Sequence, residues 1–122
     1  MLEKSITSYD DLKFAPLGEG NPVEAALLWG DPATGPAALL IRMPKGHSEP
    51  LHSHTSAYRA VLIEGRVQSR SPDAATDIAE AYGPGSYLVQ PGGQSHSEVS
   101  AGEGPLLALV FFEGPVDFVP SK

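Results

Sequence analysis

The chain has 122 residues, of which 41% are hydrophobic and 19% charged, and these values are ordinary for a single globular domain. It has no cysteine, which excludes disulfides, thiolate metal ligands and cysteine nucleophiles. The net charge is −7, and the 8 Lys and Arg residues are dispersed, whereas binding to phosphate backbones needs clustered cations. We therefore expect no binding to nucleic acid or to anionic membrane surfaces.

The sequence carries no signal for membrane insertion or for secretion. No apolar run reaches the roughly 18 residues that a membrane-spanning helix needs. The first residues, MLEKSITSYDD, contain no apolar segment like that of a secretory signal peptide. We expect a cytoplasmic protein.

Strand signals dominate the chain from end to end. Residues 8–13 and 73–80 could each form a short helix. Short apolar runs separated by Gly, Pro and Asp predict strands, at residues 23–30, 36–43, 58–64, 86–90, 95–100 and 105–112. The first two runs flank the turn-rich sequence DPATG, which predicts a hairpin.

The regular spacing of these strands defines the fold class. Strands that recur every ten residues or so are typical of an all-β sandwich or barrel. Prolines fall at the edges of the runs, where a missing N–H group is tolerated. We expect residues 1–20 to form an N-terminal arm and residues 21–122 to form one β-barrel domain.

Three of the four histidines lie between residues 47 and 54, and two of them form an H-x-H pair. On a strand, His52 and His54 would point to the same face, with Cα atoms about 7 Å apart. Imidazoles at that separation can converge on one metal ion, although such pairs also occur on solvated strand faces. His96 follows a Pro-Gly-Gly turn, which would fold it back beside a neighbouring strand.

The two histidine segments resemble the two sequence motifs of the cupin superfamily. Gly46, five residues, His52-Ser53-His54, three residues, Tyr58, six residues and Gly65 match the spacing of the first motif. The second motif matches as Gly85, five residues, Pro91-Gly92-Gly93, two residues and His96, with Ser100 where the family has Asn. The chain is most similar to small single-domain bacterial cupins.

The cupin resemblance implies a double-stranded β-helix, a jelly-roll-like β-barrel, that holds one divalent transition metal: Fe, Zn, Ni or Mn. The family's four ligand positions correspond to His52, His54, Tyr58 and His96. Tyr58 stands where the family has glutamate, and a neutral phenol is a poor ligand. We expect a three-histidine site, with Tyr58 as a catalytic residue that contacts a metal-bound water or a substrate.

Other outcomes remain open from the sequence. Glu98 could replace the missing carboxylate, since it lies two residues after His96. Glu49 is a weaker alternative. A third outcome is that metal binding is weak or lost. His47 is expected at the surface, or in contact with substrate. Arg42 could point outward, or enter the barrel to hold an anionic substrate.

The resemblance extends to zinc-binding cupin modules of anti-sigma factors and to three-histidine Fe(II) dioxygenases. We therefore expect a metal-binding cupin that is a metalloenzyme, with dioxygenase-like chemistry on a small oxygenated metabolite. The alternatives are a non-catalytic metal- or ligand-binding sensor module and a metal-free barrel that binds a polar metabolite. Exposed strand edges favour a homodimer.

Overall fold

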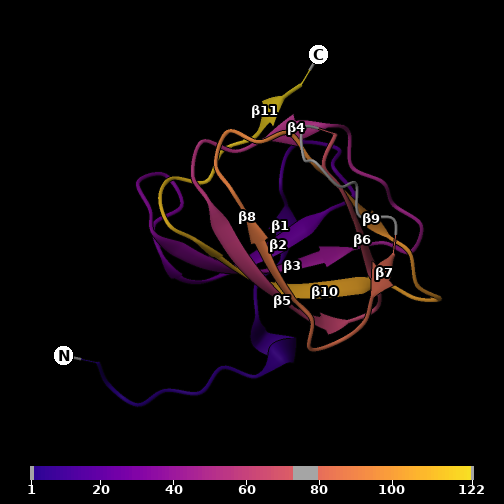
Figure 1. Cartoon of the computed structure of the whole chain (residues 1–122). Helices are drawn as coiled ribbons and strands as arrows, with labels where there is room; N and C mark the ends of the chain where they lie inside the picture. Colours follow the sequence, from indigo (N-terminus) through magenta and orange to yellow (C-terminus); the bar gives the residue numbers. More distant parts are fainter. Residues whose placement is uncertain (1, 73–79, 122) are drawn as a thin grey trace.

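The computed structural model of the chain describes residues 2–72 and 80–121, and these are built almost entirely of antiparallel strands (Figure 1). One 3₁₀ turn, η1 (Tyr9–Asp11), precedes the strands in the described residues. The strands are β1 (Ala15–Pro16), β2 (Glu24–Gly30), β3 (Ala37–Met43), β4 (His52–Ser53), β5 (Tyr58–Glu64), β6 (Val67–Arg70), β7 (Ala81–Tyr82), β8 (Tyr87–Gln90), β9 (Ser97–Ser100), β10 (Leu106–Phe112) and β11 (Val119–Pro120).

The largest layer is a six-stranded sheet in the order β1-β2-β3-β10-β5-β8. Strand β10 lies at its centre, between β3 and β5. The predicted hairpin is confirmed, because β2 and β3 pair antiparallel across the DPATG turn. In that turn, Asp31 accepts hydrogen bonds from the backbone N–H groups of Ala33 and Thr34, as aspartate commonly does in turns.

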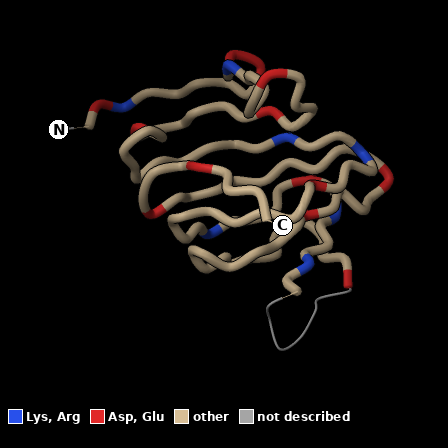
Figure 2. The backbone as a smooth tube through the Cα atoms, turned by 90° about the horizontal axis from the view of Figure 1, so that it is seen from above, with Lys and Arg blue, Asp and Glu red and all other residues tan. Residues whose placement is uncertain are grey.

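The second layer consists of a three-stranded sheet, β7-β6-β9, and a two-stranded sheet, β11-β4. The two layers face each other across the interior, and β4 and β11 lie together at one end of the molecule (Figure 1). This arrangement is a cupin jelly-roll barrel, as the sequence predicted. Lys and Arg residues are scattered over the chain instead of gathering on one face (Figure 2).

Apolar side chains that alternate along the long strands form the interior. One buried cluster joins β3, β5 and β10 through Leu39, Tyr58 and Phe112, and a second cluster includes Met43 and Leu62. Alternate strand residues point to opposite faces. Because Tyr58 points inward, the next residue, Arg59, lies on the outer face, where it pairs with Glu113.

The long strands agree with the sequence predictions to within two residues at their ends. The short strands β1, β4, β6, β7 and β11 were not predicted. Of the two expected helices, the one at residues 8–13 is only the turn η1, and residues 73–79 of the other lie outside the described residues. Strand β1 of the predicted arm pairs with β2; the domain boundary at residue 20 stays a prediction. No described helix is long and apolar enough to cross a membrane.

Candidate metal centre

Backbone pairing between two distant segments brings His52 and His96 together. His52 opens β4, and His96 directly precedes β9. The two residues exchange both backbone hydrogen bonds, with N···O distances of 3.0 and 2.7 Å. Directly opposite residues of an antiparallel pair project their side chains to the same face. The two imidazoles therefore point into the barrel from one side.

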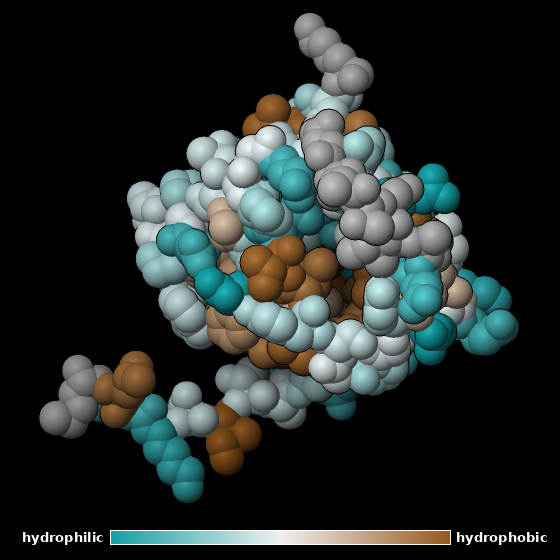
Figure 3. Space-filling model, in the orientation of Figure 1, coloured by the Kyte–Doolittle hydropathy of each residue, from teal (hydrophilic) through white to brown (hydrophobic). Residues whose placement is uncertain are grey.

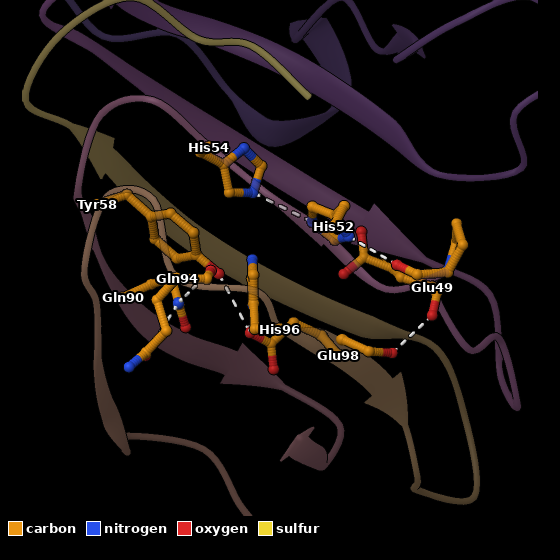
Figure 4. Close-up of polar contacts among 10 residues, drawn as sticks. Glu49, His52, His54, Tyr58, Gln90, Gln94, His96 and Glu98 are labelled. Carbon is orange, nitrogen blue, oxygen red and sulfur yellow. Dashed lines mark hydrogen bonds and ion pairs between the residues drawn. The ribbon is translucent and has the colours of Figure 1, made fainter. Parts of the chain in front are cut away.

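His54 completes the cluster from the loop after β4. Its Nε2 atom lies 3.2 Å from His52 Nε2, and the backbone N–H of Gly93 donates to its carbonyl oxygen at 2.8 Å. One ring nitrogen from each of His52, His54 and His96 lies within 4.8 Å of the other two. Figure 4 shows the three rings turned toward one another. The structure thus brings together the three histidines that the sequence singled out as ligands.

The opposite nitrogen of each ring is already engaged. His52 Nδ1 lies 2.7 Å from the carbonyl oxygen of Pro50, and His54 Nδ1 lies 2.5 Å from that of Asp117. His96 Nδ1 lies 2.7 Å from Glu98 Oε1. Because each of these partners is an acceptor, each Nδ1 carries a proton, and in a neutral ring this leaves Nε2 with the lone pair that a metal needs. Acceptors of this kind usually orient histidines that bind metals.

Burial keeps the imidazoles of His52 and His54 neutral. His52 and His96 are each only 1% exposed. Burial lowers the pKa of His52 to about 4, and it lowers the pKa of His54 as well. His96 Nε2 is buried with no hydrogen-bond partner among the described residues. Three imidazole nitrogens in one cluster, one of them without a partner among the described residues, fit a divalent transition metal.

Tyr58 and Glu98 lie beside the histidines and contact each other. The Tyr58 hydroxyl donates to Glu98 Oε1 at 3.2 Å, the same oxygen that accepts from His96 Nδ1. Burial, followed by the charge of Glu98, raises the pKa of Tyr58 well above its ordinary value, so its phenol stays neutral. Glu98 lies behind His96, away from the converging Nε2 atoms. Its position suits a residue that orients His96 more than one that replaces the missing ligand.

Glu49 also reaches this region. It lines the same cavity as the histidines, and its backbone N–H donates to the carbonyl oxygen of Glu98. Burial and the nearby charge of Glu98 raise the pKa of its carboxyl group to about 7. Figure 4 shows it on the side of His52.

Two predicted site residues lie elsewhere. Arg42 points outward, where it pairs with Glu24 at 2.8 Å and lies 3.8 Å from the centre of the Phe14 ring. His47 is partly buried and does not line the cavity. Of the two orientations that the sequence allowed for Arg42, the structure has the outward one.

The C-terminal segment contributes contacts that the sequence analysis missed. Asp117 offers its carbonyl oxygen to His54, while its carboxylate accepts hydrogen bonds from the backbone N–H and the hydroxyl of Thr55. The Phe118 ring stacks on His52, with centroids 4.2 Å apart and planes at 21°. The sequence could not identify Asp117 as the acceptor of His54, because every residue has a carbonyl oxygen. No motif marks Phe118 either.

The histidines form part of the wall of a cavity of about 790 Å³. Most of the remaining wall is apolar, with side chains from β3, β5, β8 and β10 that include Ile41, Leu62, Leu88, Ala108 and Val110. Figure 3 shows apolar side chains at the floor of a hollow in the centre of this face. The histidine cluster therefore adjoins a space large enough for a small organic molecule.

Three solved structures illustrate the fold. The polyketide cyclase RemF from Streptomyces resistomycificus has a TM-score of 0.74 and 19% identity, over 100% of this chain and 87% of that one. The DMSP lyase DddQ from Ruegeria pomeroyi DSS-3 has a TM-score of 0.71 and 19% identity, over 90% of this chain and 61% of that one. A chain of the Rhodobacter sphaeroides complex of SigE with the anti-sigma ChrR has a TM-score of 0.66 and 18% identity, over 87% of this chain and 51% of that one.

At these identities the structures show a shared fold and nothing about a shared activity. None of the curated proteins is a detectable sequence relative of this chain. The profile of one family, described as the ChrR Cupin-like domain, matches residues 2–116. The chain belongs to this family of the cupin superfamily.

Proposed function

We propose that this chain is a metal-dependent cupin enzyme in which His52, His54 and His96 hold one divalent transition metal ion. Its substrate would be a small oxygenated molecule bound in the adjoining cavity. The observation that carries the proposal is the set of three Nδ1 acceptors, at 2.7, 2.5 and 2.7 Å. These acceptors orient three rings whose ligand nitrogens lie within 4.8 Å of one another.

A divalent metal with three imidazole ligands has positions left for water or substrate oxygens, lowers the pKa of bound water and, as Fe(II), supports oxygenase-type chemistry. The chain's own residues would prepare the site for a substrate. Glu98 keeps the His96 proton on Nδ1 and fixes the Tyr58 hydroxyl. We assign to Tyr58 the role of orienting a substrate oxygen, because its phenol is neutral and lines the cavity.

Elemental analysis of protein purified without added metal or chelator tests the metal site. We expect about one Fe, Zn, Ni or Mn ion per chain, lost in His52→Ala and His96→Ala. His47→Ala is the matched control, because His47 lies outside the cluster, and it should keep the metal. Unchanged metal content in both cluster variants would refute the three-histidine site.

A second function is favoured by the family match. A non-catalytic sensor module is supported by the ChrR Cupin-like profile and by the similar fold in the complex of SigE with the anti-sigma ChrR. Oxygen uptake by the Fe(II)-loaded protein with diketones or hydroxyketones would favour the enzyme. Firmly bound zinc without turnover, together with capture of a sigma factor, would favour the sensor.

A further inference from the structure

The wall of the cavity carries information about its ligand beyond the metal centre. The apolar side chains of four strands of the large sheet face the space, and Ile41, Leu88 and Val110 are among them. Its volume of about 790 Å³ lies within the range of pockets that enclose drug-sized ligands. A water or a single small anion would leave most of this wall uncovered, so the lining suits a ligand with a substantial apolar body.

Among the described residues, no cationic side chain reaches this space. No Lys or Arg lines the cavity among the described residues, and residues 73–79 contain neither. Arg42, the residue that could have held an anionic substrate, is paired with Glu24 on the outer face. An anionic ligand tail would therefore be buried without a partner charge, which costs far more free energy than burying a neutral tail.

Two of the three acidic side chains in the described wall are engaged with the protein. Glu98 accepts from His96 and Tyr58. Asp117 accepts from Thr55 through both carboxylate oxygens. The third acidic residue of the described wall, Glu49, lies on the side of His52, at the metal end of the cavity (Figure 4). The wall that would face the tail of a ligand therefore has little capacity to pair with a cationic group.

We infer that the cavity binds a neutral, largely apolar molecule that offers one or two oxygen atoms to the metal at the histidine cluster. This inference rests on the proposed metal site and narrows its substrate class. The apolar body lies against the strand wall from Ile41 to Val110, and the oxygen-bearing end lies beside Tyr58. Small dicarboxylates, phosphorylated metabolites and organic cations are poor ligands for such a site.

Calorimetry on the zinc-loaded protein tests the inference with four catechols. All four share the same pair of adjacent hydroxyl groups, which can bind the metal, and they differ in the tail. Zinc is suitable because it does not activate dioxygen. We expect 4-propylcatechol to bind about tenfold more tightly than catechol, because its propyl group is buried. Dopamine and 3,4-dihydroxyphenylacetate, which carry a charged group on a tail of similar size, should bind about tenfold more weakly than 4-propylcatechol. Equal or tighter binding of either charged compound would overturn the inference.

Cavity-filling variants locate the binding. Ala108→Phe and Ile41→Phe should reduce the preference for 4-propylcatechol over catechol to about twofold or less, because the added ring occupies the space of the tail. Leu109→Phe, at the next position of β10 and outside the cavity lining, is the matched control and should keep the preference. A preference that survives both cavity variants in folded protein would also overturn the inference.

The experiments distinguish an error in the proposed metal site from an error in the inferred chemical class of the ligand. Protein that binds no zinc refutes the proposed function. The ligand class is then tested on the metal-free protein by thermal shift with 4-propylphenol, tyramine and 4-hydroxyphenylacetate. A larger stabilisation by the neutral phenol would support the inference, and a larger one by either charged phenol would refute it.

Discussion

Glu98 is the side chain on which the candidate site depends most. One of its oxygens accepts from both His96 and Tyr58, and the other is buried without a partner in the described part of the chain. The acceptors of His52 and His54 are backbone carbonyl groups. Side-chain substitution can therefore remove the acceptor of His96 directly, but not those of the other two rings.

The first prediction concerns removal of this acceptor. Glu98→Ala should lower the affinity for zinc by about 10–100-fold, because His96 loses the group that fixes its ring and its proton. Competition with a chelator of known affinity measures the change. Glu113→Ala removes an exposed carboxylate paired with Arg59, and it should leave the affinity unchanged. Equal affinities in the two variants would contradict the role of Glu98.

The second prediction concerns Tyr58, which occupies the family's fourth ligand position. Tyr58→Phe should retain the metal, because the three imidazoles remain and the Glu98 contact with His96 is untouched. The variant should lose roughly 1 kcal/mol of stability with its buried hydrogen bond. Metal analysis together with chemical denaturation measures both effects. Loss of the metal from a folded variant would identify Tyr58 as a ligand.

Titrations of opposite sign contribute to the pH dependence of the metal-free protein, and His52 and Glu49 are the clearest examples. The pKa of His52 is about 4 in the folded chain, below its ordinary 6.5. The unfolded chain therefore binds the extra proton between these values, and the free energy of unfolding falls as the pH is lowered. The pKa of Glu49 is raised from 4.5 to about 7. The folded chain retains that proton, so its contribution falls as the pH rises.

The third prediction separates these opposing contributions. Glu49→Gln removes the carboxyl group, so the loss of stability on acidification from pH 6.5 to 4.5 should steepen by up to about 1.4 kcal/mol per pH unit. Denaturation of metal-free protein across this range provides the slopes. Glu113→Gln is the exposed control and should follow the wild type. A slope that does not change in Glu49→Gln would mean that the Glu49 pKa is not raised.

At the scale of elements, the site depends on contacts between loops and short strands. Strand β4 has two residues, and β9 has four. The turn at Pro91–Gln94 approaches the loop after β4 closely, and a Cβ atom on Gly92 would lie 2.5 Å from the carbonyl oxygen of Thr55. The next residue, Gly93, donates its N–H to His54. This close approach fixes the backbone that carries His54, the second proposed ligand.

The fourth prediction follows from this approach. Gly92→Ala should destabilise the protein by about 1–3 kcal/mol, because the backbone at Thr55 must move. It should also weaken zinc binding, because His54 is the adjacent residue. Gly104→Ala is the matched control, since a Cβ atom there meets nothing within 4 Å. Denaturation and chelator competition on both variants provide the comparison, and equal behaviour would refute the steric argument.

The sequence predicted the elements that have strong apolar patterns. The runs at β2, β3, β5, β8 and β10 carry enough apolar residues to be recognised. Strands β4 and β11 are only two residues long and exist because they pair with each other, so no local pattern marks them. The motif spacing grouped His52, His54 and His96, whereas the carbonyl acceptors at Pro50 and Asp117 could not be found. Any residue can supply a carbonyl, and only tertiary structure determines which one does.

At the scale of the whole molecule, the outer face of the six-stranded sheet remains partly apolar. Trp29 is 52% exposed and Phe111 37%, and their ring centroids lie 6.5 Å apart. Val89 and Ile63 are exposed on the neighbouring strands β8 and β5. Exposed apolar patches on soluble domains commonly mark protein interfaces. The homodimer expected from the sequence stays a prediction, and this face is where we expect it to form.

The fifth prediction tests that interface. The wild type should be a dimer by light scattering at micromolar concentration, and Phe111→Glu should be monomeric, because a carboxylate would be buried without a partner. Val119→Glu is the control, since Val119 is similarly exposed but lies on β11. A wild-type monomer, or a folded Phe111→Glu dimer, would show that this face is not the interface.

The acceptor of His54 lies 63 residues further along the chain, at Asp117. Because a ribosome makes the chain from its N-terminus, all three imidazoles are synthesised before the residue that orients one of them. A nascent chain that ends at residue 100 already contains the three proposed ligands but lacks the acceptor of His54 Nδ1. We therefore expect metal to enter the finished site only after the C-terminal segment has docked, so that metal loading reports the completion of folding.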